Sequence, residues 1–226
     1  MPELPEVETM ARDLAPQLIG RTIRDPFLAR PKLSPDPDLL TGIAGRRISA
    51  VRRRAKSIVI ELGDRAILLA PRMSGAPRID PVGTEPAKHD HFGFDLAEGR
   101  RRIGTFRWRD PRMFGRIRLV RITPSGYRDS VGRDPFGAIG PEPLEIGSTE
   151  IAARIAARPR AGIKALLLDQ RTVAGIGNIY ADEALHRARI HPRALAGSLS
   201  SAQRRLLGRT IVAVLEAGIA DRGARV

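Results

Sequence analysis

The sequence contains no cysteine and only four histidines among its 226 residues. Without cysteine there can be no disulfides, iron–sulfur clusters, thiolate zinc sites or cysteine nucleophile. No stretch approaches the roughly 20 apolar residues of a membrane span, and residues 1–10 are too acidic for a secretory signal. We therefore expect a soluble, intracellular protein with no membrane partner.

Acidic residues are also in deficit. The chain has 39 Lys and Arg residues and 25 Asp and Glu residues, which gives a net charge of +14. The chain is 42% hydrophobic and 28% charged, a composition typical of globular rather than disordered proteins. Because such an excess of positive charge is the electrostatic signature of a protein that binds a polyanion, nucleic acid is the leading candidate partner.

The apolar pattern changes along the chain. Apolar residues at three- and four-residue spacing predict an amphipathic helix over 4–19, and the Pro and Glu residues in front of it favour a helix start. Short apolar runs over about 21–122, punctuated by Gly, Pro and Asp, predict an antiparallel β-sandwich or barrel. Closely spaced Gly and Pro residues over 123–147 indicate a linker.

Helical spacing then returns in four segments: 151–157, 163–169, 179–188 and 200–220. The second half of the chain is therefore predicted to be all-α. Together these patterns predict an α+β protein of two domains. The expected parts are an N-terminal antiparallel β-sandwich with an N-terminal helix (1–122), a linker (123–147) and an all-α domain (148–226).

The N-terminus allows a structural and a chemical interpretation. As structure, Pro2 and Glu3 begin a helix, because proline fits the first turn and acidic side chains complement the helix dipole. As chemistry, removal of Met1 would expose the secondary amine of Pro2. An α-amino pKa of about 7.7–8.0 makes such an amine a better nucleophile at neutral pH than a lysine near 10.4. Its attack on a sugar aldehyde carbon would give a cationic iminium, with Glu3 placed to move protons.

Two other motifs are weaker. His89 and His91 flank an aspartate, but no cysteine or further histidine lies nearby to complete a metal site. Gly175 and Gly177 could begin a dinucleotide fingerprint, yet Tyr180 occupies the position of the third glycine and no βαβ pattern surrounds it. A turn between two helices fits this segment better.

Seven segments, in order, resemble the bacterial formamidopyrimidine-DNA glycosylase family and its endonuclease VIII relatives over essentially the whole chain. They are PELPEVET (2–9), RRAK (53–56), MSG (73–75), KHDH (88–91), DPRMFG (110–115), GPEPL (140–144) and AGIGNIYADE (174–183). The opening segment is closer to the formamidopyrimidine branch. The resemblance implies a DNA repair enzyme, a bifunctional N-glycosylase and abasic-site lyase working by β-elimination. Its implied substrates are oxidised purines such as formamidopyrimidine and 8-oxoguanine, and no cofactor is required.

The resemblance also implies a role for four catalytic residues. Pro2 is the Schiff-base nucleophile and Glu3 the proton donor. Glu6 supports the charge that develops on the sugar, and Lys56 donates a proton in β-elimination. A cation beside the scissile phosphates also helps the leaving group.

Seven residues are implied to contact DNA: Met73, His89, Arg112, Phe114, Arg160, Lys164 and Asn178. Met73, Arg112 and Phe114 match residues that fill the gap left by an extruded base. By residue type alone, Met73 and Phe114 would be expected in the core. The others are implied to contact the DNA backbone, in part through a helix–two-turn–helix motif whose helix N-terminus binds phosphate.

The chain ends at residues 222–226, where most of the family continue with a base-capping loop and a four-cysteine zinc finger. A naturally shortened member and a cut chain both fit. Alternatives within the family are a preference for oxidised pyrimidines, abasic sites or single-stranded DNA. The alternative from another class is a non-catalytic binder of damaged DNA. We expect damaged DNA as the partner, a monomer, and a cytoplasmic, nucleoid-associated location.

Overall fold

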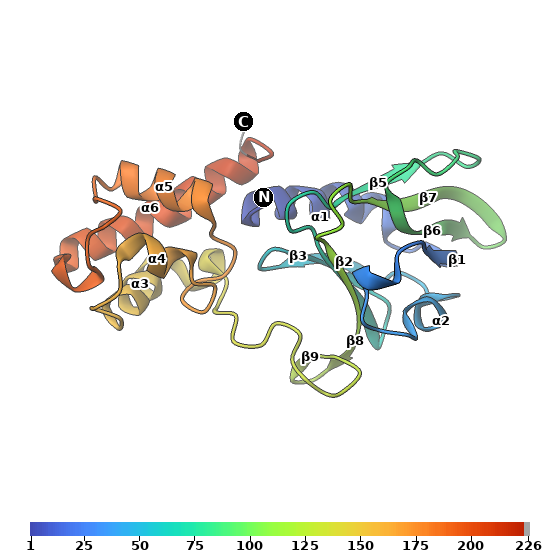
Figure 1. Cartoon of the computed structure of the whole chain (residues 1–226), viewed down its shortest axis with the longest axis horizontal. Coiled ribbons are helices and arrows are strands. Elements are labelled where there is room, and N and C mark those ends of the chain that lie inside the picture. Colours follow the sequence, from blue (N-terminus) through green and yellow to red (C-terminus); the bar gives the residue numbers. More distant parts are fainter. Residues whose placement is uncertain (224–226) are drawn as a thin grey trace. The chain divides into compact units, whose positions relative to one another are not determined.

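The computed structural model describes residues 1–223 and divides the chain into two compact units (Figure 1). The first unit contains residues 1–2 and 10–137, and the second contains residues 3–9 and 138–226. Helix α1 (Leu4–Leu18) contributes its first residues to the second unit and the remainder to the first, and confirms the helix predicted over 4–19. The last three residues of the predicted all-α domain lie outside the described residues. Among those described, none of the helices combines the length and the apolar character needed to cross a bilayer.

The first unit consists of two antiparallel sheets, in the orders β1-β6-β7-β5 and β2-β3-β4-β8-β9. The strands are β1 (Thr22–Leu28), β2 (Ala50–Arg54), β3 (Ser57–Glu61), β4 (Arg65–Ala70), β5 (Ala76–Asp80), β6 (Asp90–Glu98), β7 (Arg101–Arg109), β8 (Arg116–Thr123) and β9 (Gly126–Arg128). Two short helices, η1 (Pro31–Leu33) and α2 (Leu39–Ile43), follow β1. The predicted antiparallel sandwich is therefore confirmed.

Four aromatic side chains of β6 and β7 are completely buried in the core of this unit. Phe92 and Phe94 lie two residues apart on β6 and therefore point to the same face of the sheet, because successive strand residues alternate between the two faces. On β7, Phe106 and Trp108 are equally buried, and the rings of Phe94 and Phe106 stack with their centroids 4.7 Å apart. Four large rings on two paired strands fix the register of β6 against β7.

The second unit is helical beyond residue 138. Its helices are α3 (Pro143–Ala156), α4 (Ile163–Leu168), α5 (Asn178–Arg187), η2 (Ala196–Ser198) and α6 (Ser201–Ala220). Ser200 and Gln203 form a reciprocal capping box at the start of α6. α6 packs closely on α3 at Gly208. A Cβ on this residue would lie 2.3 Å from the Ser148 carbonyl oxygen, so the close approach requires a glycine. The all-α prediction for this half is confirmed.

The boundary between the units falls between Gly137 and Ala138, inside the stretch 123–147 predicted to be a linker. That stretch also contains β9 and the first residues of α3. In α3, Gly147 has a φ of 69° and separates two helical segments. Gly and Pro residues therefore mark turns and a kink here rather than an irregular chain throughout.

Candidate functional site

Residues predicted for the site occur in both units. In the first unit are Pro2, Lys56, Met73, His89, Arg112 and Phe114, and in the second are Glu3, Glu6, Arg160, Lys164 and Asn178.

In the second unit, the Glu3 carboxylate is only 3% exposed and lies at the N-terminus of α5. Its Oε2 accepts hydrogen bonds from the backbone N–H of Gly177 at 2.6 Å and of Tyr180 at 3.4 Å. Its Oε1 accepts one from the N–H of Ile179 at 2.9 Å. The first N–H groups of a helix have no partner within it, and the helix dipole favours an anion there. Gly177 is the N-cap residue of α5 and has no side chain that could cap the helix. The carboxylate of Glu3, from the other end of the sequence, caps it instead.

Two glycines create the space for this contact. A Cβ on Gly177 would lie 2.3 Å from Cδ of Glu3, and one on Gly175 would lie 2.7 Å from Cβ of Leu4. Gly175 also has a φ of +83°, which side-chain-bearing residues rarely adopt. The side chain of Gln170 holds the turn, because it accepts from the Gly175 N–H at 2.9 Å and donates to the Ile176 carbonyl at 2.8 Å. The glycines are therefore needed for close approach of the N-terminal segment.

Glu6 links the start of α1 to Tyr180 of α5. Its Oε2 accepts the backbone N–H of Glu3 at 2.8 Å, and its Oε1 accepts the hydroxyl of Tyr180 at 2.8 Å. On α6, a Cβ at Gly218 would lie 2.5 Å from the Tyr180 hydroxyl oxygen, so this glycine leaves room for the ring. The sequence places Tyr180 in the segment AGIGNIYADE but assigns it no role in the site. Its contact with Glu6 joins residues 174 positions apart, for which the local sequence holds no signal.

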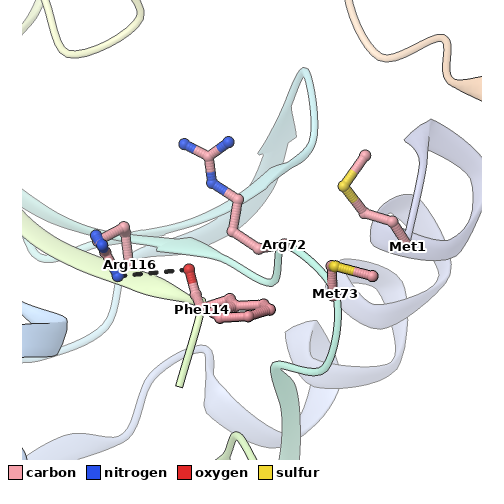
Figure 2. Close-up of a pocket in the computed structure, with 5 residues that line it drawn as sticks. All are labelled: Met1, Arg72, Met73, Phe114 and Arg116. Atoms are coloured by element: carbon pink, nitrogen blue, oxygen red, sulfur yellow. Dashed lines mark hydrogen bonds between the residues drawn. The ribbon is translucent and has the colours of Figure 1, made fainter. Parts of the chain in front are cut away.

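In the first unit, Met73 and Phe114 line an open pocket of about 300 Å³ together with Met1, Arg72 and Arg116. Figure 2 shows the Phe114 ring pointing toward Met73. Both of these apolar side chains are 47% exposed, so the expectation from residue type alone that they lie in the core is wrong. Their position at the pocket makes them available to a ligand.

Arg112 lies beside this pocket. Its guanidinium carbon is 4.8 Å from the centre of the Phe114 ring, within the range of a cation–π contact. The structure therefore brings together all three residues predicted to fill the gap left by an extruded base: Met73 and Phe114 line the pocket, and Arg112 is stacked on Phe114.

Lys56 and His89 occupy two other turns of the first unit. Lys56 follows Ala55, which has a φ of 51°, in the tight turn between β2 and β3. His89 is half-buried just before β6, and its ring meets that of His91 edge-on at 6.2 Å. Burial is the main cause that lowers the pKa of His91. Within residues 1–223, no cluster of three or more His, Cys, Asp or Glu is placed to hold a metal ion.

The remaining predicted DNA contacts lie on the second unit. Arg160 and Asn178 are exposed, and Asn178 is the first residue of α5. Lys164, which is expected to contact a phosphate, forms an ion pair with Asp182, with Nζ 2.8 Å from Oδ1. Sequence reasoning gave no role to Asp182, nor to Asp110, whose side chain is completely buried.

Comparison with known proteins identifies related families for both units. Residues 1–117 match the formamidopyrimidine-DNA glycosylase N-terminal domain, and residues 139–226 match the formamidopyrimidine-DNA glycosylase H2TH domain. The formamidopyrimidine-DNA glycosylase of Chloroflexus aurantiacus is 46% identical over 99% of this chain and 78% of its own length. That of Geobacter sulfurreducens is 41% identical over 98% of this chain and 79% of its own length.

Solved structures agree with these relatives. The Lactococcus lactis formamidopyrimidine-DNA glycosylase bound non-covalently to DNA with an abasic site has a TM-score of 0.85 and 30% identity, covering 98% of this chain and 82% of its own. A variant of the Lactococcus lactis enzyme in complex with DNA containing Fapy-dG has a TM-score of 0.86 and 30% identity, covering 100% of this chain and 81% of its own.

Proposed function

This chain belongs to the formamidopyrimidine-DNA glycosylase family, and from this premise we propose that it excises oxidised bases from DNA and cleaves the resulting abasic site through Pro2. The observation that carries the proposal is the placement of Glu3. The residue directly after the candidate nucleophile has a buried carboxylate held at both oxygens by backbone N–H groups. Such fixed geometry is what proton transfer at a reacting sugar requires.

The reaction begins once Met1 has been removed. The nitrogen lone pair of Pro2 attacks C1′ of the damaged nucleotide, the N-glycosidic bond breaks, and the base leaves with its electron pair and gains a proton. The nitrogen of Pro2 then loses its own proton. Opening of the sugar ring at O4′, which is also protonated, leaves an iminium between Pro2 and C1′. Loss of a C2′ proton then expels the 3′-phosphate as the C3′–O3′ bond breaks, and water releases Pro2.

The chain's own acidic and basic groups have separate tasks in this scheme. Glu3 donates protons during base loss and ring opening, and Glu6 stabilises the positive charge that develops on the sugar. Lys56, on the tight turn between β2 and β3, donates a proton in the elimination step and offsets charge on the leaving phosphate.

Recognition of the damaged nucleotide requires its extrusion from the duplex, which leaves a gap in the stack. We call Met73, Arg112 and Phe114 the wedge residues and the segments 71–75 and 110–115 the wedge loops. The exposure of Met73 and Phe114 supports their insertion between bases, and the stacked Arg112 supplies a cation for the orphaned base. His89 of the first unit binds a DNA phosphate. Three residues of the second unit, Arg160, Lys164 and Asn178, also bind DNA phosphates.

The proposed enzyme acts as a monomer, because one chain carries both groups of site residues. Its proposed location is the cytoplasm, at the nucleoid, where its DNA substrate lies. Oxidised purines such as 8-oxoguanine are the proposed substrates. A preference for oxidised pyrimidines, abasic sites or single-stranded DNA is the alternative within the same chemistry.

Borohydride trapping tests the chemistry directly, because reduction of the iminium makes the enzyme–DNA adduct permanent. The protein, with Met1 removal verified by mass spectrometry, is mixed with duplexes that carry an abasic site, 8-oxoguanine or an oxidised pyrimidine. We expect an adduct that Pro2→Gly abolishes, and its dependence on the lesion identifies the preferred base.

Controls separate this outcome from binding alone. Pro5→Gly changes another proline of the same segment and is expected to keep the adduct. If a free Pro2 and measurable DNA binding give no adduct on any duplex, the enzyme proposal fails, and a non-catalytic binder of damaged DNA takes its place. Binding must also weaken steeply with salt, because phosphate contacts release counterions.

A further inference from the structure

The Asp110 carboxylate is completely buried and joins the two wedge loops. Its Oδ1 accepts hydrogen bonds from the Ser74 hydroxyl at 2.5 Å and from the Met113 N–H at 3.0 Å. Its Oδ2 accepts the Gly115 N–H at 2.7 Å. The Ser74 hydroxyl oxygen in turn accepts the N–H of Arg112 at 3.2 Å. One side chain of the first loop and three backbone amides of the second therefore converge on a single carboxylate and its hydroxyl partner.

Both loops contain a strained residue next to a wedge residue. Arg72, immediately before Met73, has a φ of 55°, and Met113, between Arg112 and Phe114, has a φ of 54°. Residues with a Cβ rarely adopt this left-handed conformation, and it persists where the surrounding structure holds it. Asp110 supplies such a hold on Met113, whose N–H it accepts through both its side chain and its carbonyl oxygen.

Glycines allow the loops to approach this anchor closely. A Cβ on Gly115 would lie 2.8 Å from Oδ2 of Asp110, and one on Gly75 would lie 2.4 Å from Cζ2 of Trp108. The tight fit at Asp110 accounts for Gly115 at the end of the DPRMFG motif. It also leaves both carboxylate oxygens facing hydrogen-bond donors.

We propose that Asp110, together with Ser74, is a positioning residue that fixes both wedge loops before DNA binds. This inference rests on the proposed function of the wedge residues. Asp110 is buried beneath the loops, and it acts by keeping Met73, Arg112 and Phe114 in the arrangement that fills the gap. Preformed loops avoid the entropic cost of ordering them during base extrusion.

Asp110→Asn tests this arrangement with little change of volume. The NH2 group of the asparagine would face one of the N–H or O–H groups that now donate to Asp110. At least one hydrogen bond to a wedge loop is therefore lost. Ser74→Ala is the milder variant and removes the link to Arg112. Single-turnover cleavage is measured on a duplex with the preferred oxidised base and on a single-stranded abasic oligonucleotide, in which no partner strand leaves a gap to fill.

We expect Asp110→Asn to slow duplex cleavage at least about tenfold, on the scale known for small misplacements of functional groups. Cleavage of the single strand is expected to change less than about twofold. Ser74→Ala should give the same selectivity with a smaller loss. In the free protein, hydrogen exchange at the amides of Met113 and Gly115 should accelerate in Asp110→Asn.

Matched controls come from the same unit. Asp36 is a buried aspartate that accepts the Leu119 N–H at 2.8 Å, and Ser49 is a hydroxyl that donates to the Glu61 carbonyl at 3.1 Å. Asp36→Asn and Ser49→Ala should leave the ratio of duplex to single-strand cleavage unchanged.

Equal losses on both DNAs, or an unchanged duplex rate, would overturn the positioning role. Unchanged exchange at Met113 and Gly115 would overturn it independently of activity. Wild-type protein that traps no DNA would instead contradict the proposed function, so the two failures are distinguishable.

Discussion

Two buried carboxylates, one in each unit, are held by backbone N–H groups but serve different ends. Glu3 is 3% exposed and accepts three N–H groups around the start of α5, and Asp110 is 0% exposed and accepts two N–H groups of a wedge loop. Glu3 is itself the proposed proton donor. Asp110 has no proposed chemistry and positions exposed side chains.

The difference shows how the same hydrogen-bonding device suits two requirements. A reacting carboxylate must have a fixed position, and backbone amides of a helix N-terminus provide it without mobile side chains. The wedge residues must be exposed to enter DNA, so their position has to be fixed by a buried group that does not itself contact the DNA. Substitutions that separate chemistry from positioning should therefore affect the two units differently.

The largest effect is expected from Glu3→Gln, which has almost the same shape but removes the proton donor and turns an amide NH2 toward at least one of the N–H groups that Glu3 now accepts. Base excision from a duplex should fall by about 10²–10⁴-fold, the usual contribution of general acid–base catalysis, while binding to an abasic duplex is retained. Glu150→Gln, at an exposed glutamate of α3 that pairs with Arg154, is the control and should be neutral. If Glu3→Gln still excised the base at the wild-type rate, Glu3 would not be the proton donor, and it would not differ from Asp110 in having a chemical role.

Gly177→Ala tests whether the position of Glu3 matters apart from its chemistry. The new Cβ would lie 2.3 Å from Cδ of Glu3, so the carboxylate must shift. Excision should fall by about 10²-fold, as for a misplacement of roughly 1 Å. Gly162→Ala is a matched control, because Gly162 also precedes a helix, has a φ of −63° and has nothing within 4 Å of an added Cβ. Equal rates of the two variants, with thermal melts confirming that both fold, would contradict the need for this cradle.

A smaller effect is expected where a carboxylate is paired with a cation instead of backbone amides. Asp182 and Lys164 form an exposed pair, which is worth about 0.2–1 kcal/mol. Asp182→Asn should release Lys164 for a phosphate and tighten DNA binding by roughly two- to fivefold, because 1.4 kcal/mol is tenfold. Fluorescence anisotropy against an abasic-site duplex measures it, with Glu183→Gln, which frees Arg187 on the same helix, as the control. Affinity that is unchanged or weaker in Asp182→Asn would show that Lys164 does not bind DNA.

Periodicity predicted most of the fold but not the contacts that hold the site. The helices predicted over 4–19, 163–169, 179–188 and 200–220 follow from the spacing of apolar residues and agree with the structure to within one residue at each end. The helix predicted from 151 begins earlier, at Pro143, and the strands were predicted only as short runs over about 21–122. The partner of Glu3 could not be predicted, because its donors are backbone amides 174 or more residues away, and such groups carry no residue-type signal. Met73 and Phe114 show the converse, since exposed apolar residues are indistinguishable from core residues by type. Asp110 lies in the DPRMFG motif, but its complete burial, on which the proposed positioning role rests, cannot be seen in the sequence.

The smallest effect concerns Asp169, a carboxylate of the second unit that accepts a backbone N–H from Arg171 but also pairs with two guanidinium groups. Hydrogen bonds from Arg171 and then Arg158 hold the pKa of Asp169 well below its ordinary value. Its stabilisation is therefore present above the unfolded pKa of about 3.9 and is lost as the pH falls through the folded-state value. Asp169→Asn should destabilise the protein at pH 7 by less than about 1 kcal/mol, because the charges are partly solvated. In thermal melts from pH 7 to 3, the gap to wild type should narrow, whereas Asp221→Asn, at an exposed aspartate, should give little gap at any pH. A gap that stays constant to pH 3 would mean that Asp169, like Asp110, acts by shape and hydrogen bonding rather than by its charge.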